Sequence, residues 1–211
     1  MRTEDLVNVL VADRAAGRRP VWRRLIVALA VGGLVSLALF VVEFGARTDL
    51  DPALATWRFD LKLAMVVLAL VLVFRLCLAL ARPAGGKRAL RSLVPLAAVA
   101  AGAVAIELAT VPASAWGTRL VGSNSMICLT AIPLLALAPL AAILAALRSG
   151  APSSPTLAGA AGGLLAAMAA ATLYAFHCFD DSPLFVVTWY TLATVPVMIV
   201  GAVAGRRVLR W

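Results

Sequence analysis

Charged side chains are scarce in this chain. Only 14% of its 211 residues are Asp, Glu, Lys or Arg, whereas 63% are hydrophobic and the mean hydropathy is +0.99. Soluble domains carry about 25% charged residues, so this composition excludes a water-soluble globular protein. The connections between the apolar stretches are short, and they leave no room for a separate soluble domain.

Residues that carry thiol, metal or acid–base chemistry are also few. The chain has one histidine and three cysteines, Cys77, Cys128 and Cys178. No Cys-x-x-Cys motif is present, which argues against the alternative of a membrane thiol-disulfide oxidoreductase. The other alternative, a small transporter, needs charged groups that face one another at mid-membrane depth. Arg75 is the only cation away from the ends of an apolar segment and has no acidic residue at its level, so we expect no transport path and no enzymatic activity.

Six long apolar segments make up most of the chain. Each is long enough to cross a hydrocarbon core of roughly 30 Å. Backbone polar groups cannot remain unpaired in lipid, so each segment is expected to form a helix. The sequence therefore predicts an all-α, polytopic membrane bundle of six transmembrane helices. The expected helices are Leu25–Phe44, Leu61–Ala81, Ser92–Val111, Met126–Leu147, Leu157–His177 and Leu184–Ala204.

Basic residues are sorted to one side of these segments. Lys and Arg accumulate in the cytoplasmic loops of membrane proteins, so both termini are expected in the cytoplasm of a bacterial inner membrane. The net charge of +9 is then an orientation signal, and no direct nucleic-acid partner is expected. The inner basic residues are Arg2, Arg14, Arg18, Arg19, Arg23, Arg24, Arg82, Lys87, Arg88, Arg91, Arg148, Arg206, Arg207 and Arg210, and the outer ones are Arg47, Arg58, Lys62 and Arg119.

The chain divides into residues 1–24, a cytoplasmic amphipathic segment, residues 25–204, the bundle, and residues 205–211, a basic tail. Within the first segment an apolar stripe follows a helix start at Thr3. A short amphipathic helix is marginal alone in water. It is expected either to lie on the lipid surface or to fold into a groove on a protein partner. The residues of the stripe are Leu6, Val7, Leu10 and Val11.

Two cysteines are expected at the same depth, because Cys128 begins the fourth predicted helix and Cys178 ends the fifth, both on the outer side. A disulfide requires Cα atoms within roughly 4.4–6.8 Å, which neighbouring helices can supply. On a helical path, His177 and Asp181 share a face, as do Cys178 and Asp181. The candidate ligands for a soft or borderline divalent metal are thus Cys128, Cys178, His177 and Asp181.

The adjacent carboxylates distinguish two uses of these cysteines. Asp180 and Asp181 are expected to raise the pKa of Cys178, which makes it a poor catalytic nucleophile. A bound cation reverses that penalty, so the cluster favours metal or oxidant sensing over thiol exchange. No cofactor is required, and a metal ion would act as the signal. A purely structural role at the helix ends remains an alternative, and Cys77 is expected to pack in the bundle.

Arg75 and Glu107 are the two charged residues furthest from the expected loops. Arg75 is near enough to the inner end of its helix for its side chain to reach water. Glu107 lies near the outer end, where we expect it to meet Lys62 or the region of Glu43. The two differ too much in depth to pair directly. Both are candidates for signal transmission, with a structural role as the alternative.

Glycines recur at four-residue spacing in the last two helices, as Gly159 with Gly163 and Gly201 with Gly205. Small residues at this spacing let membrane helices approach closely. We expect these faces to pack within the bundle. Homodimerisation through the same faces is the alternative.

Several of these stretches are similar to a known family. Over essentially its whole length the chain resembles the NrsF-type proteins (negative regulator of sigma F), six-helix inner-membrane anti-sigma factors of proteobacteria. The matching stretches are Tyr174-Ala-Phe-His-Cys178-Phe-Asp-Asp-Ser-Pro183, Trp189-Tyr190, Gly205-Arg-Arg-Val-Leu-Arg-Trp211, Leu147-Arg148, Ala151-Pro152, Pro155, Ala158-Gly159-Ala160 and Thr3-Glu4-Asp5-Leu6.

The resemblance implies a regulator that holds an extracytoplasmic-function sigma factor at the membrane, with the apolar stripe of the first segment as the binding surface. In the family, two outer-side cysteines are tied to release of the sigma factor under metal or oxidative stress. Their matches in this chain are Cys128 and Cys178. The resemblance supplies the identity of the partner, which the residues alone do not.

Overall fold

The computed structural model describes residues 20–83 and 87–209, and within these ranges the regular elements are all helices. Six of the helical segments are long and apolar enough to cross a membrane. The predicted all-α bundle of six spans is confirmed, and the chain is a multi-pass membrane protein. The orientation of its termini stays a prediction.

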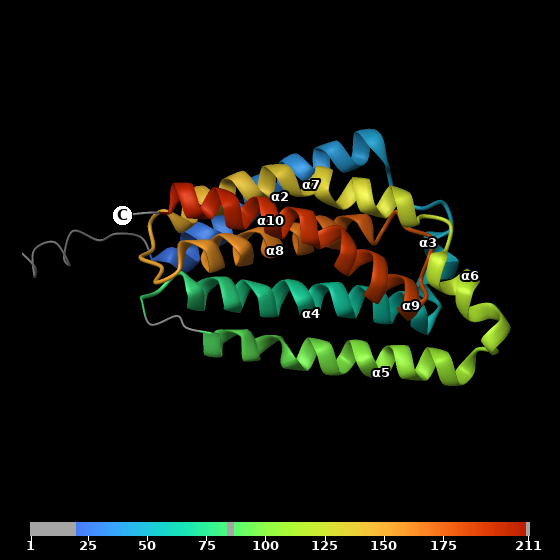
Figure 1. Cartoon of the computed structure of the whole chain (residues 1–211). Coiled ribbons are helices and arrows are strands. Elements are labelled where there is room, and N and C mark those ends of the chain that lie inside the picture. The colour runs from blue at the N-terminus through green and yellow to red at the C-terminus, as the bar shows by residue number, and fades with distance from the viewer. Residues whose placement is uncertain (1–19, 84–86, 210–211) are drawn as a thin grey trace, which may run out of the picture.

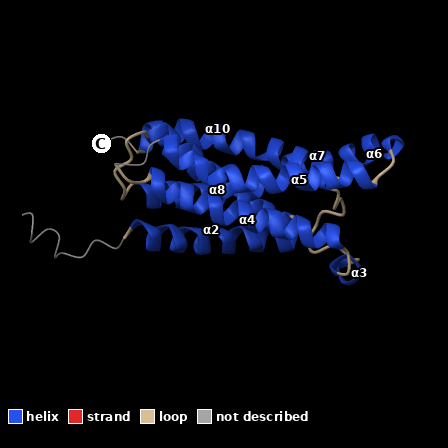
Figure 2. Ribbon diagram, turned by 90° about the horizontal axis from the view of Figure 1, so that it is seen from below, coloured by secondary structure: helices blue, strands red, loops and turns tan. Residues whose placement is uncertain are grey.

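The spans are connected by short helical pieces (Figures 1 and 2). The elements are α2 Val21–Glu43, α3 Leu50–Leu54, α4 Trp57–Leu80, η1 Lys87–Leu93, α5 Val94–Thr110, η2 Ala113–Ala115, α6 Trp116–Val121, α7 Ser125–Leu147, α8 Pro155–Tyr174, α9 Pro183–Phe185, η3 Val186–Tyr190 and α10 Thr191–Val208. The fourth span includes η2, α6 and α7, and the sixth runs from α9 through a π-helical turn at η3 into α10.

Helix α8 forms the centre of the bundle, with α4, α7 and α10 packed around it. Its sequence is rich in Ala and Gly, so neighbouring backbones can approach it closely on several sides. Helix α5 lies at the edge beside α4 (Figure 1). Helix α2 crosses the outside of α7. Cys77 is buried in the common core, as predicted for a packing residue.

The glycine faces of α8 and α10 pack against each other. A Cβ atom at Gly159 would lie 2.3 Å from the carbonyl oxygen of Gly201, and one at Gly163 would lie 2.4 Å from that of Val197. The intramolecular packing predicted from the glycine spacing is therefore confirmed. The same faces are covered by the bundle itself and offer no free surface to a second copy, and homodimerisation stays a prediction.

Several helix boundaries differ from the predicted ones, including that of α4, which begins at Trp57 rather than Leu61. Helix α2 begins at Val21, after Pro20, so Arg23 and Arg24 lie in its first turn and their long stems run beside apolar surface. Helix α10 extends to Val208, into the predicted tail. Helix α8 ends at Tyr174, before the predicted His177. The predicted binding stripe lies outside the described residues and stays a prediction; it consists of Leu6, Val7, Leu10 and Val11.

The two ends of the bundle differ in charge. At the end formed by α3, α6 and α9, on the right in Figure 1, lie all carboxylates of the described residues: Glu43, Asp49, Asp51, Asp60, Glu107, Asp180 and Asp181. We call this the carboxylate end. The opposite end, called the arginine end, holds Arg23, Arg24, Arg82, Arg88, Arg91, Arg148, Arg206 and Arg207.

Candidate functional site

The segment Cys178–Ser182 connects α8 to α9 at the carboxylate end and has no helical structure. We call it the 178–182 loop. Its last three side chains bond to three different parts of the bundle, and its first residue is one of the two candidate sensing cysteines. The loop is therefore the point where the connections at the carboxylate end meet.

Asp180 ties the loop to the start of α7. Its Oδ2 atom accepts hydrogen bonds from the backbone N–H groups of Ser123 at 3.0 Å and Asn124 at 2.8 Å, just before the helix begins. A carboxylate is stabilised at this position because a helix N-terminus presents free N–H groups and a positive dipole. Gly122, with φ +59°, allows the approach, since a Cβ there would lie 2.6 Å from Asp180 Cγ.

Asp181 ties the loop to α4 and to the connection after α2. Its Oδ2 lies 2.9 Å from Arg47 Nη1, and its Oδ1 pairs with Lys62 Nζ. The same two cations donate to the carbonyl oxygen of Cys178, Lys62 at 2.8 Å and Arg47 at 3.2 Å. Both side chains are buried, with exposed fractions of 0% and 5%. The Cys178 peptide is thus clamped between two buried cations.

Arg47 also pairs with Asp49 at 2.7 Å. The hydrogen bonds to Asp49 and Asp181 raise the pKa of Arg47, because they outweigh the cost of burying the charge. The same bond from Arg47 holds the pKa of Asp49 below its usual value. The guanidinium therefore remains a permanent cation beside the loop.

Ser182 ties the loop to Glu107, which is completely buried. Ser182 Oγ donates to Glu107 Oε1 at 3.2 Å, and the same carboxylate pairs with Arg119 Nη1 at 2.8 Å and Arg58 Nε at 3.0 Å. The predicted partners of Glu107, Lys62 or the region of Glu43, are wrong. Arg58 and Lys62 lie one turn apart on one face of α4, and each takes a different carboxylate.

The four basic residues that the sequence places on the outer side are the ones that make these ion pairs, each with Asp181 or Glu107. Sequence reasoning missed this role. The positive-inside rule disfavours Lys and Arg on the outer side. The presence of four such residues there was therefore an available signal that they form specific ion pairs. They are Arg47, Arg58, Lys62 and Arg119.

Cys128 and Cys178 are both free and completely buried. They belong to one core cluster and lie within electrostatic reach of each other. Burial raises the pKa of Cys178, and the Lys62 ammonium offsets only part of that effect. The Cys178 thiol is therefore protonated at rest, as predicted, although burial rather than the Asp180 charge is the main cause.

The predicted helical pairing of His177, Cys178 and Asp181 is wrong. Helix α8 ends at Tyr174, the backbone turns over residues 175–177, and residues 178–182 have no regular secondary structure. His177 Nδ1 instead lies 3.0 Å from the carbonyl oxygen of Gly45, to which it donates. The backbone N–H of Arg47 donates to the carbonyl oxygen of Phe176 at 2.9 Å. These bonds fasten the end of α8 to the chain that leaves α2.

The four candidate metal ligands are not gathered as one ligand set. Asp181 is committed to Arg47 and Lys62, and His177 to Gly45. Across residues 20–83 and 87–209, three or more His, Cys, Asp or Glu side chains are nowhere placed to hold a metal ion. The remaining pair of soft ligands is Cys128 and Cys178.

Two tyrosines lie beside the cysteines. The rings of Tyr174 and Tyr190 are 6.0 Å apart, and both hydroxyls are buried with no hydrogen-bond partner among the described residues. Buried hydroxyls normally have a partner, and leaving one unpaired is costly. Both hydroxyls lie close enough to the Cys178 side chain to interact with it, so a polar group that forms at the cysteines has two buried hydroxyls beside it.

Arg75 lies apart from this network. It is exposed on α4 towards the arginine end and forms no ion pair with any described residue. The structure does not bring Arg75 and Glu107 together, as their difference in depth predicts. A transmission role for Arg75 stays a prediction, whereas Glu107 contacts the 178–182 loop directly through Ser182.

Fold and site together define a multi-pass α-helical membrane protein with a buried, cysteine-containing loop network at one end. The chain belongs to the NrsF family, described as negative regulator of sigma F, whose profile matches residues 10–211. It is 35% identical to the anti-sigma-F factor NrsF of Caulobacter vibrioides and 29% identical to the probable anti-sigma-F factor NrsF of Azospira oryzae. Both matches cover 100% of this chain and of the relative. No solved structure matches the chain.

Proposed function

We propose that this chain is a membrane-bound, non-enzymatic anti-sigma factor. In this proposal, residues 1–19 bind an extracytoplasmic-function sigma factor and keep it from RNA polymerase, and Cys128 and Cys178 sense metal or oxidative stress. Membership of the NrsF family and the similarity over the full length to two proteins named as anti-sigma-F factors support the regulatory role. The residues proposed to contact the sigma factor are Leu6, Val7, Leu10 and Val11.

The arginine end is proposed to lie in the cytoplasm of the bacterial inner membrane. The charge difference between the two ends of the bundle supports this orientation, since basic residues are retained on the cytoplasmic side. Residues 1–19 then precede Pro20 on the cytoplasmic side, where a sigma factor is found. The cysteines and the 178–182 loop face the periplasmic side, which is oxidising.

The observation that carries the sensing proposal is the clamp on the Cys178 peptide. Its carbonyl oxygen is held by Lys62 from α4 and by Arg47 from the chain after α2. A change at the sulfur moves this peptide. Because the interior is close-packed and polar groups there must stay bonded, the two cations follow it or lose their partner.

Helix α2 is the proposed connection to the sigma-binding segment. It is continuous over 23 residues, about 35 Å, from the loop network to Val21. It also contacts α7, the helix that carries Cys128. The close contacts are the hydrogen bond from Ser36 Oγ to the Leu135 carbonyl at 2.6 Å and Gly32, where a Cβ would lie 2.5 Å from Pro139 Cα. Helix α2 is therefore in contact with α7, which carries Cys128, and is connected through Arg47 to the 178–182 loop, which carries Cys178.

The chemical event is proposed to be a bridge between the two sulfurs. A soft metal ion would replace both thiol protons and be held by two thiolates. An oxidant would accept two electrons and two protons as the S–S bond forms. Either bridge restrains the 178–182 loop and α7 in a new arrangement. A 100-fold loss of sigma-factor affinity requires about 2.7 kcal/mol, which is within the usual range of coupling between two sites.

The binding half of the proposal is tested by deleting residues 2–16 from the full chain. The cognate sigma factor should then move from the membrane fraction to the soluble fraction. Continued co-purification of the deleted chain with the sigma factor refutes this half.

The sensing half is tested with Cys128→Ser combined with Cys178→Ser, and Cys77→Ala is the matched control. The double variant should hold the sigma factor as the wild type does, but expression of its target genes should no longer respond to metal or oxidant. Normal induction in the double variant refutes sensing and leaves the binding half intact.

A further inference from the structure

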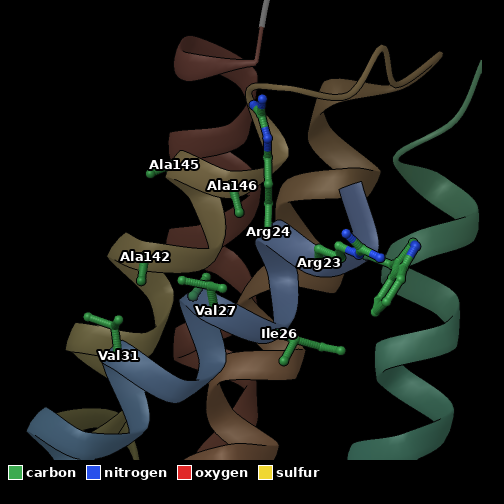
Figure 3. A pocket seen from close by; sticks show the side chains of 10 residues that line it. Arg23, Arg24, Ile26, Val27, Val31, Ala142, Ala145 and Ala146 are labelled. Carbon is green, nitrogen blue, oxygen red and sulfur yellow. The ribbon is translucent and has the colours of Figure 1, made fainter. Parts of the chain in front are cut away.

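A groove of about 800 Å³ lies at the arginine end between α2 and α7. Figure 3 shows it from close by: Val27 and Val31 of α2 face the small side chains of α7, Arg24 extends towards the end of the bundle, and Arg23 and Ile26 extend to the side of α2 away from α7. It is distant from the cysteines and from the ion-pair network, which lie at the carboxylate end. Its position in the membrane and its chemistry therefore need a separate explanation.

The groove follows from the way α2 crosses α7. The two helices touch most closely at Gly32 and Pro139, and they are joined nearby by the bond from Ser36 to Leu135. Towards the arginine end they diverge, and side chains would have to fill the gap. Helix α7 offers only methyl groups there, from Ala142, Ala145 and Ala146, so the space stays open.

The two ends of the groove differ in character. Ile26, Val27 and Val31 line its deeper part, and all three are exposed in the bundle. Arg23 and Arg24 lie at its rim in the first turn of α2. Neither arginine forms an ion pair with a described residue, and all described carboxylates are at the other end of the protein. The groove thus matches a molecule with apolar chains and an anionic head.

The dimensions match one membrane leaflet. Trp22 and Val31 are separated by about 14 Å along the helix, close to half of a hydrocarbon core of roughly 30 Å. Trp22, with Arg23 stacked 5.1 Å from its ring centre, is the type of residue that lies at the headgroup level. The arginine rim is therefore at the depth of lipid phosphates, and the apolar part is at the depth of acyl chains.

We infer that this groove binds an anionic phospholipid of the cytoplasmic leaflet, with its phosphate on Arg23 and Arg24 and an acyl chain along Val27 and Val31. Guanidinium groups bind phosphate strongly and with geometric preference, and basic pockets between transmembrane helices at the cytoplasmic side suit such head groups. The inference depends on the proposed membrane orientation. It does not depend on the sigma factor or the cysteines.

Charge disfavours the other occupants. A second copy docked by twofold symmetry would bring its own Arg23 and Arg24 against the same rim. Residues 1–19 offer no net negative charge to the arginines, because their basic residues outnumber the acidic ones. These are Arg2, Arg14, Arg18 and Arg19 against Glu4, Asp5 and Asp13.

The lipid is expected to steady the start of α2. The head group on Arg23 and Arg24 and the acyl chain along Val27 and Val31 would hold the first turns of this helix against α7.

Native mass spectrometry of the detergent-solubilised full chain tests the inference, with phosphatidylglycerol and phosphatidylcholine as probes. Wild-type protein should retain phosphatidylglycerol in preference to phosphatidylcholine. Arg23→Gln with Arg24→Gln should weaken retention of phosphatidylglycerol by about tenfold or more. The matched control, Arg206→Gln with Arg207→Gln, removes the same charge from exposed positions at the same end and should change little.

A second pair of variants tests the groove without changing charge. Ala142→Leu fills the groove and should lower retention of phosphatidylglycerol, whereas Ala141→Leu, on an exposed position that does not line it, should not. Equal loss from both arginine pairs, or equal retention of the two lipids by the wild type, overturns the inference. Stronger lipid binding after deletion of residues 2–16, or a dimer that dissociates when the groove is filled, assigns the groove to another occupant and also overturns it.

Discussion

The buried ammonium group of Lys62 donates a hydrogen bond to the carbonyl oxygen of Cys178 at 2.8 Å while it pairs with Asp181 of the same loop. One side chain of α4 thus holds both ends of a short segment that begins with a candidate sensing cysteine. This arrangement makes the conformation of the loop depend on the cysteine. If the carbonyl or the carboxylate moved away from Lys62, a buried charge would lose a partner, which is costly.

Replacement of Lys62 by Met is expected to loosen the 178–182 loop. The change keeps an apolar stem but leaves Asp181 with Arg47 alone, and breaking a buried ion pair costs about 3 kcal/mol or more. We expect a loss of this size in the free energy of unfolding, measured in detergent, and faster alkylation of Cys178. Arg75→Met, on an exposed residue with no described ion pair, is the control and should change neither quantity appreciably. Equal stability of the two variants would contradict the clamp.

Gly159→Ala is expected to destabilise the bundle. The added methyl group would lie 2.3 Å from the Gly201 carbonyl and 2.7 Å from Gly205 Cα, so α8 and α10 must separate. Overpacking of this kind costs about 1–3 kcal/mol. Gly102→Ala in α5 is the matched control, because no atom outside its own helix turn lies within 4 Å and Ala favours a helix by up to about 1 kcal/mol. Thermal unfolding should show opposite shifts, and a common shift would argue against the close packing of α8 and α10.

The alkylation of Cys178 should depend on pH in the manner of a buried thiol. Burial raises its pKa, so the thiolate is scarcer at a given pH and the rate profile moves to higher pH than for an exposed cysteine. The measurement compares Cys178 in a Cys77→Ala, Cys128→Ser background with Ala55→Cys in a chain lacking all native cysteines, since Ala55 is exposed at the same end. Coinciding profiles would contradict a buried resting thiol.

The same shift links folding to pH. The folded state holds the Cys178 proton more tightly than the unfolded state does. The proton on Cys178 therefore contributes fully to the free energy of unfolding below the ordinary pKa of a thiol. This contribution is lost as the pH rises through the higher pKa that Cys178 has in the folded state.

The apolar runs predicted the six spans because lipid leaves the backbone only helical solutions, and the glycine spacing predicted the contact of α8 with α10. The positions of Cys128 and Cys178 at one end followed from the same helices. The loop network did not follow, since it depends on where α8 ends. Three residues beyond Tyr174 form a turn, and this removes the helical spacing that would have placed His177 and Asp181 side by side.

The sequence also could not predict which cation of the network pairs with which carboxylate. Arg58 and Lys62 are adjacent on α4, and only the three-dimensional position of Glu107 and Asp181 decides which cation meets which carboxylate. The unpaired hydroxyls of Tyr174 and Tyr190 depend on packing between α8 and the sixth span in the same way.

The most direct test of the account is the affinity of the nanodisc-embedded Cys77→Ala chain for its sigma factor, measured before and after bridging of Cys128 and Cys178 with mercuric ion. We expect the bridged chain to bind about 100-fold more weakly, a coupling of about 2.7 kcal/mol, and the chain that also carries Cys128→Ser and Cys178→Ser to keep its affinity. An unchanged affinity after bridging, or an equal loss in the chain without these cysteines, would contradict coupling between the loop and the sigma-binding segment.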